Sequence, residues 1–195
     1  ADLGYETYQK ILGEAVQELK TEEFADLYAE ELKAGEEKIS GQNFVEECTI
    51  ESDLELLFPN EYIPSSSERM LLYRELDSIN EEREVQAFRE RLEDRFGKVP
   101  DEGLELMRIV RLRRLAKRLG TEKVFLKAGR MTLYFVSNPD SPYYQSAAFD
   151  KVIRYMQKYP RGCKLREQDT KRSMVIANVD RVETAVGILE EMSNL

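Results

Sequence analysis

The sequence has 195 residues, of which 42% are hydrophobic and 34% are charged, and its net charge is −9. This composition suits one domain with a core of its own, or one domain with an appendage, and it excludes the collagen-like class. It also excludes the membrane-spanning class, because no apolar run approaches the roughly 20 residues that cross a bilayer. The N-terminus lacks a charged and then apolar signal segment, so we expect a cytoplasmic location.

Enzymatic chemistry finds little support in the residues. Histidine is absent from the sequence, which removes the commonest general base and metal ligand. No phosphate-binding loop, dinucleotide fingerprint, nucleophile elbow or calcium loop occurs. A pair of carboxylates stays as a remote catalytic alternative. We therefore expect a non-catalytic chain without a cofactor, whose distant Cys48 and Cys163 are buried thiols.

Charge divides the chain into two parts. Residues 1–60 hold 16 acidic side chains against 4 lysines, whereas residues 61–195 carry a small positive excess. We interpret the first part as a connector that meets water or a basic partner, with a plain linker as the alternative. Apolar residues at helical spacing predict an amphipathic helix at about 4–20, and an acidic helix follows at 21–39. The predicted division is a helical connector at 1–42 and a domain at 43–195.

One strand and three helices are predicted next. Alternation from Asn43 to about Asp53 indicates a strand. The first two helices follow from apolar stripes, and the second stripe consists of Val85, Phe88, Leu92 and Phe96. Gly97 should end the second helix, since it takes a positive φ at little cost, and Pro100 should start the third.

The third helix carries the one strong basic patch. Its basic side chains lie opposite an apolar face and are Arg111, Arg113, Arg114, Lys117 and Arg118. Three interpretations are open, namely a solvated face, contact with an acidic protein surface, and contact with a phosphate backbone. No stacking aromatic residues interleave with these arginines, which weakens the last.

Beyond Gly120 the same arrangement is predicted twice, with two short strands followed by an amphipathic helix. The first set covers 123–127, 131–136 and 149–156, and the second covers 164–167, 173–177 and 182–192. Four strands in one antiparallel or mixed sheet with helices on a face give an α+β fold whose first half is helical. The loop at 138–144 carries Tyr143 and Tyr144, which either anchor a partner or fold back onto the core.

Several motifs combine into a family resemblance. The segment from Tyr62 to Gly120 contains Tyr62-Ile63-Pro64, Arg69, Tyr73, Asp94-Arg95-Phe96-Gly97-x-x-Pro100 and Leu112-Arg113 before Leu119-Gly120. The start of the chain adds Gly4-Tyr5-x-x-Tyr8, Ala15-Val16 and Leu19-Lys20. Together these motifs resemble the C-terminal domain of the bacterial transcription-repair coupling factor, with the N-terminal part similar to the segment that follows the translocase motor of that family.

The resemblance implies a regulatory role. The parent family couples an ATP-driven DNA translocase to removal of stalled RNA polymerase and to recruitment of the repair protein UvrA in nucleotide excision repair. The C-terminal domain is then an autoinhibitory clamp, which masks the N-terminal UvrA-binding module of the same polypeptide and restrains the motor. The implied partners are that module and, through the parent, UvrA, RNA polymerase and duplex DNA, with no membrane.

The resemblance also implies where the clamp surface lies. In the family it centres on acidic residues near the Asp-Arg-Phe-Gly turn, and Asp94 stands at the matching place. Arg91 stands where the family can present a carboxylate, so Glu90 or Glu93 would substitute for it. Arg95 also belongs to the motif. Phe96 falls on the buried stripe and is expected in the core, and Asp94 either meets the partner or pairs locally with an arginine. The alternative function is an accessory nucleic-acid-binding domain that uses the basic helix at 108–118.

Overall fold

A computed structural model describes residues 44–195. The helices expected at 4–20 and 21–39 lie outside these residues. The elements in chain order are β1 (Thr49–Ser52), α3 (Ser66–Ser78), α4 (Glu82–Phe96), α5 (Asp101–Arg118), β2 (Thr121–Lys127), β3 (Arg130–Phe135), the 3-10 helix η1 (Pro142–Gln145), α6 (Ala147–Lys158), β4 (Cys163–Gln168), β5 (Lys171–Ala177) and α7 (Val182–Ser193). The α+β class with a helical first half is confirmed.

The sheet has five strands in the order β1-β2-β3-β5-β4. The four expected strands form two antiparallel hairpins that join through β3 and β5, and β1 adds a parallel edge strand beside β2. The strand expected from Asn43 is shorter than predicted. Only Thr49–Ser52 pairs with β2, because Phe44 and Cys48 are buried in the core before the ladder begins.

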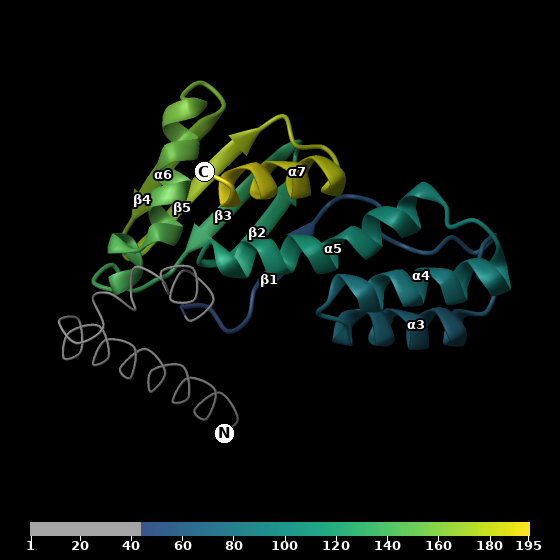
Figure 1. Ribbon diagram of the computed structural model, residues 1–195. Coiled ribbons are helices and arrows are strands. Elements are labelled where there is room, and N and C mark those ends of the chain that lie inside the picture. Colours follow the sequence, from purple (N-terminus) through teal and green to yellow (C-terminus); the bar gives the residue numbers. More distant parts are fainter. Residues whose placement is uncertain (1–43) are drawn as a thin grey trace, which may run out of the picture.

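The two faces of the sheet differ. One face carries side chains that are at most 3% exposed, namely Val124, Leu126, Met131, Leu133, Met174 and Ile176. Figure 1 shows α5, α6 and α7 lying across one side of the sheet. We call the other side the open face. From each strand it presents the residues that alternate with the buried ones, which are Glu51, Lys123, Phe125, Lys127, Arg130, Thr132, Tyr134, Lys164, Arg166, Lys171, Ser173 and Val175.

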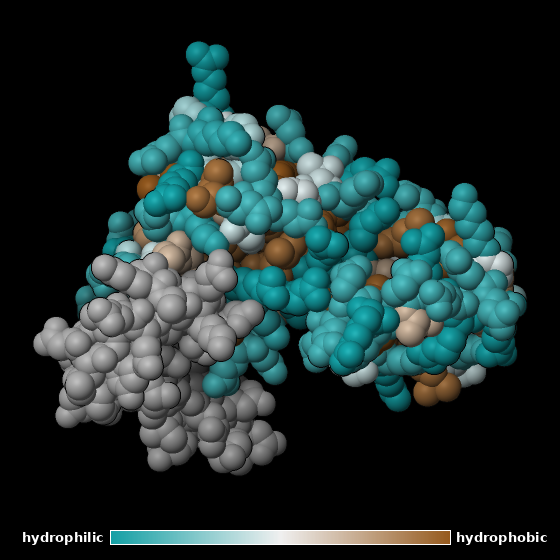
Figure 2. All heavy atoms as spheres, in the orientation of Figure 1, coloured by the Kyte–Doolittle hydropathy of each residue, from teal (hydrophilic) through white to brown (hydrophobic). Residues whose placement is uncertain are grey.

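A second, smaller core forms in the helical half. It gathers Phe58, Ile63, Phe88 and Leu92 with Met107 and Val110 of α5. Ile109 and Leu112, on another side of α5, belong to the main core instead. α5 is therefore the shared wall between the sheet and the α3–α4 pair, which Figure 1 shows beside its N-terminal half. Hydrophilic side chains cover most of this view, with hydrophobic atoms mainly between the elements (Figure 2).

The helix ends follow the expected chemistry. Ser65 caps α3 by accepting a hydrogen bond from the Glu68 amide at 3.3 Å. α4 ends at Gly97, whose φ of +83° lies in the region that glycine tolerates best. Two acidic residues occupy the first turn of α5, where the free amides favour negative charge.

The loop with two tyrosines folds back onto the protein. Tyr143 is fully buried in η1, and its hydroxyl donates to the Leu119 carbonyl. The Tyr144 hydroxyl donates to the Val136 carbonyl. Both rings pack against Phe149, with centroids 5.5 and 4.9 Å away. Of the two interpretations of this loop, the one in which the aromatic residues return to the core is confirmed.

Candidate interdomain surface

The motif residues around the end of α4 hold the helical half together. The Tyr62 hydroxyl donates to the Gly97 carbonyl at 2.7 Å, and its ring lies 5.7 Å from that of Phe96. Phe96 is partly buried against the smaller core, as the stripe predicted. The Arg69 guanidinium donates to the Ile63 and Pro64 carbonyls at 2.6 and 3.2 Å. The motif therefore fixes the chain entry into α3 and the turn that follows α4.

Two of the four predicted clamp residues already have partners inside the domain. Arg89 donates to Glu93 at 2.9 Å in an i,i+4 ion pair along α4. Arg95 forms an ion pair with Glu68 of α3, and its guanidinium lies 4.9 Å from the Phe96 ring. The structure thus places Glu93 and Arg95 on opposite flanks of α4, each directed at a neighbour.

Glu90 and Asp94 are the two that face outward. They are exposed, lie one helical turn apart, and project on the side of α4 opposite to its buried residues Val85, Phe88 and Leu92. Within residues 44–195, the side chain of Asp94 has no hydrogen bond or ion pair, and the side chain of Glu90 accepts only a hydrogen bond from Gln86 at 3.3 Å. Local pairing of Asp94 with an arginine is therefore not seen, and the pair forms an acidic surface without a cation of its own.

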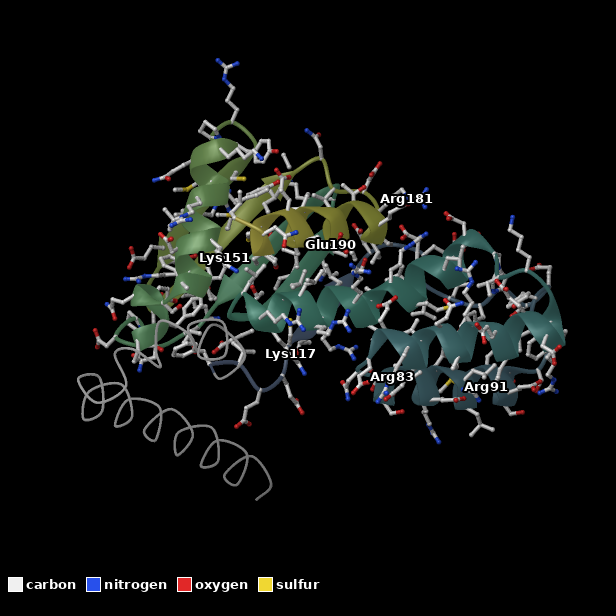
Figure 3. All side chains as sticks on the ribbon, viewed as in Figure 1. Arg83, Arg91, Lys117, Lys151, Arg181 and Glu190 are labelled. Carbon is white, nitrogen blue, oxygen red and sulfur yellow. The ribbon has the colours of Figure 1, made fainter. Side chains whose placement is uncertain are left out.

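Two acidic residues of α3 form ion pairs with arginines of α4, and these pairs were not predicted from the sequence. Glu75 pairs with Arg91, and Glu68 pairs with Arg95. Arg91 also lies 5.7 Å from the Phe88 ring. Each pair joins two residues that are far apart in the sequence and lie on different helices, so no local sequence pattern predicts it. Figure 3 shows Arg83 and Arg91 on α4, whose ribbon runs alongside α3.

The basic side chains of α5 point to three different neighbours. Arg111 forms an ion pair with Glu190 of α7, Arg113 lies 3.3 Å from Asp77 of α3, and Arg114 lies 3.7 Å from Glu82 of α4. Lys117 and Arg118 have no ion pair among the described residues. Lys117 leaves α5 on a side away from α7 (Figure 3). Three of the five predicted basic-patch residues therefore serve to fasten helices together.

The thiols are buried and separate. Cys48 and Cys163 are both free. Burial raises the pKa of Cys48 to about 12, although the nearby Arg113 and Lys117 charges lower it in part, and burial also raises the pKa of Cys163. Among the described residues no group of three or more acidic or cysteine side chains could hold a metal ion. None of the helices in this part of the chain is long and apolar enough to cross a membrane.

Comparisons with known proteins agree with the resemblance. Residues 52–146 match the family model of the TRCF domain. The transcription-repair-coupling factor of Rickettsia bellii is 26% identical over 171 residues, an overlap that covers 85% of this chain and 14% of that relative. The factor of Escherichia coli K12 is 30% identical over 122 residues, which cover 63% of this chain and 10% of that relative. The chain thus spans 14% or less of the length of these relatives.

A solved structure shares the fold. The crystal structure of the C-terminal domain of a transcription-repair coupling factor superposes with a TM-score of 0.60, at 17% identity, over 76% of this chain and 94% of that one. The fold and this superposition place the chain in the α+β class of that domain. The chain carries a TRCF domain at residues 52–146 and is similar to the C-terminal domain of the transcription-repair coupling factors.

Proposed function

We propose that this chain is the non-catalytic regulatory domain of a transcription-repair coupling factor, and that it binds the UvrA-binding module of its own polypeptide. When bound, the domain masks the module and restrains the ATP-dependent translocase that acts on stalled RNA polymerase. The observation that carries the proposal is the exposed pair Glu90 and Asp94 beside the motif turn at Gly97, two carboxylates that form no ion pair with any residue of 44–195. We also propose the division into a connector at 1–42 and the regulatory domain at 43–195.

The chemistry of the surface fits a reversible contact. Exposed carboxylates attract arginines of a partner, steer its approach and fix its orientation, while they add only modest affinity. A modest affinity is sufficient inside one polypeptide, because a tether supplies an effective concentration on the order of millimolar. Release then requires only a competing contact that favours the open state. The α3–α4 ion pairs support this role, since they join the presenting helix to its neighbour and occupy Arg91 and Arg95, two of the arginines nearest to this surface in the sequence.

Calorimetric titration of the chain with the purified UvrA-binding module tests the proposal. We expect Asp94→Arg to weaken binding by about tenfold or more, because it replaces attraction by repulsion. Glu84→Arg is the matched control, because Glu84 is an exposed acid of the same helix whose side chain has no ion pair or hydrogen bond among residues 44–195. It lies ten residues away, about 15 Å along the axis. An arginine-to-aspartate replacement in the module should restore affinity for the Asp94→Arg chain. Equal affinities for all three chains would refute the assignment of this surface.

A further inference from the structure

The open face of the sheet has the composition of a ligand-binding surface. Phe125, Thr132, Tyr134 and Val175 are only partly buried, although they lie on the three central strands. Within the described residues no helix covers them, in contrast to the buried side chains that point toward α5, α6 and α7. Here the sheet forms an open groove of about 570 Å³. Such a surface is either solvated or occupied by a partner.

Strand register places two aromatic rings at the centre of this groove. Phe125 stands opposite Thr132, and Tyr134 stands opposite Lys123, so the two rings are diagonal neighbours on adjacent strands. Their centroids lie 5.5 Å apart with planes at 81°. Val175 faces Thr132 from β5 and extends the apolar floor. The rings are therefore held in place by the strands rather than by a mobile loop.

Cations surround the rings. The open face carries the six basic side chains Lys123, Lys127, Arg130, Lys164, Arg166 and Lys171. Glu51 pairs with Lys123 and Lys127 at 3.5 and 3.2 Å, and these two ammonium groups also lie 4.9 Å from the Phe125 ring. Glu122 lines the groove and accepts the Ser137 amide at 3.4 Å.

The other four cations are not neutralised inside the domain. Arg130, Lys164, Arg166 and Lys171 are exposed and have no ion pair among residues 44–195. Three arginines of α5 differ in this respect, because Arg111, Arg113 and Arg114 pair with α7, α3 and α4. Four cations without an ion pair thus surround the aromatic floor, whereas α5 keeps two, Lys117 and Arg118, with no aromatic floor beside them.

We propose that the open face binds a single-stranded nucleic acid. Aromatic side chains on a sheet stack with unpaired bases, and cations at the rim contact the phosphates. A duplex keeps its bases stacked and paired, so it would use the cations and leave Phe125 and Tyr134 without a role. An acidic peptide would likewise gain little from two rings at the floor. Stacking tolerates any base, so the site should prefer strandedness over sequence. The proposal is independent of the surface on α4.

Fluorescence anisotropy with labelled single strands of thymidylate and of uridylate, and with a duplex of equal length, tests this inference on the full 195-residue chain. At about 50 mM salt we expect both single strands to bind more tightly than the duplex. The double variant Arg166→Glu with Lys171→Glu should lose at least about tenfold in affinity and flatten the salt dependence. The matched control is Lys117→Glu with Arg118→Glu, the same charge change on α5, which should stay within about twofold of the unmodified chain.

The rings are tested separately, because charge alone does not distinguish a strand from an acidic peptide. Phe125→Leu and Tyr134→Leu should each weaken single-strand binding by about fivefold or more. Tyr134→Trp keeps an aromatic ring and gives a chain without tryptophan its only indole, so binding should be retained and its fluorescence quenched. Circular dichroism confirms that each variant is folded. Duplex binding as tight as strand binding, unchanged affinity in the leucine variants, or poly-glutamate bound as tightly as the strand would each overturn the proposal.

Discussion

Glu105 of α5 caps the N-terminus of α7. Its two carboxylate oxygens accept the backbone amides of Val182 and Glu183 at 2.9 and 3.0 Å, from a side chain that is almost fully buried. The residue before α7, Arg181, supplies no side-chain cap of its own. The contact therefore joins the shared helix α5 to the last helix of the chain and satisfies two of the free amides at a helix start.

Removal of this carboxylate should destabilise the domain. For Glu105→Ala we expect a loss of about 2–4 kcal/mol in the free energy of unfolding, because two charge-assisted hydrogen bonds vanish and one buried and one partly buried amide lose their acceptor. Urea denaturation measures the change. Glu102→Ala, in the first turn of the same helix, should cost at most about 1 kcal/mol, the contribution of a charge near a helix end. Similar losses in both variants would contradict the capping role.

Gly120 should be far less replaceable than Gly129. Both have positive φ, at +74° and +71°, so alanine costs about 1 kcal/mol of backbone strain at either position. A Cβ at Gly120 would also overlap the buried ring of Tyr143, whereas no atom lies within 4 Å of a Cβ at Gly129. We expect Gly120→Ala to lower the unfolding temperature by several degrees more than Gly129→Ala. Equal shifts would mean that the Tyr143 ring moves aside freely.

The free energy of unfolding should fall as the pH rises above about 9, and the ionisation of Cys48 should contribute to this fall. Burial holds the pKa of Cys48 at about 12 in the folded chain, above its ordinary value of 9.0. The folded state therefore binds more protons, and this contribution is fully present below pH 9 and is lost as pH rises toward 12. The slope is at most about 1.4 kcal/mol per pH unit for one group.

Replacement of the thiol isolates this contribution. In Cys48→Ala the decline above pH 9 should be shallower, because only Cys163, whose pKa burial also raises, then contributes there. Tyr144 and Tyr155, with pKa values raised by burial to about 12, add to the decline from about pH 10 in both chains. Urea denaturation at pH 7, 9 and 10.5 provides the measurement, and the two chains are compared by the slope and not by their absolute stability. Parallel pH profiles for both chains would exclude Cys48 as a source of the effect.

The arginines of α5 should affect stability unequally. Arg111→Glu places two negative charges together at Glu190, so we expect a loss of about 1 kcal/mol. Arg118→Glu removes a charge with no ion pair in the described part of the chain and should change stability by less than about 0.5 kcal/mol. Thermal unfolding in low salt distinguishes the two. A test of DNA binding by the basic helix is accordingly cleaner at Lys117 and Arg118.

Local chemistry was sufficient to predict much of the fold. The spacing of Val85, Phe88 and Leu92 predicted α4, and Gly97 ends it at a positive φ as expected. The turn between β2 and β3 lies in the gap between the strands expected at 123–127 and 131–136, with Ala128 and Gly129 at positive φ. These features depend on a few consecutive residues whose own conformational preferences agree with the tertiary structure.

Contacts between distant residues were beyond the sequence. No residue near Arg111 in the sequence shows that Glu190 is its ion-pair partner. The basic residues of α5 were therefore predicted to form one surface, although three of them pair with three different helices. The alternation of Phe125 with lysines in β2 was visible, yet which face of the strand is covered depends on where α5 and α7 pack. Asp94 was singled out from the motif, and only the structure shows that its side chain pairs with no residue of 44–195.

β1 has a consequence for how such a domain can change over generations. Its parallel partner β2 follows α5 in the chain, so α3, α4 and α5 all lie within one crossover between neighbouring strands. The helical half is thus not a detachable module at one end. A deletion or exchange that included β1 would remove the edge strand of the sheet. A replacement of the segment between β1 and β2 would have to bring the chain back to the same position beside β1. Variation is therefore expected in the exposed side chains of the helices rather than in their number.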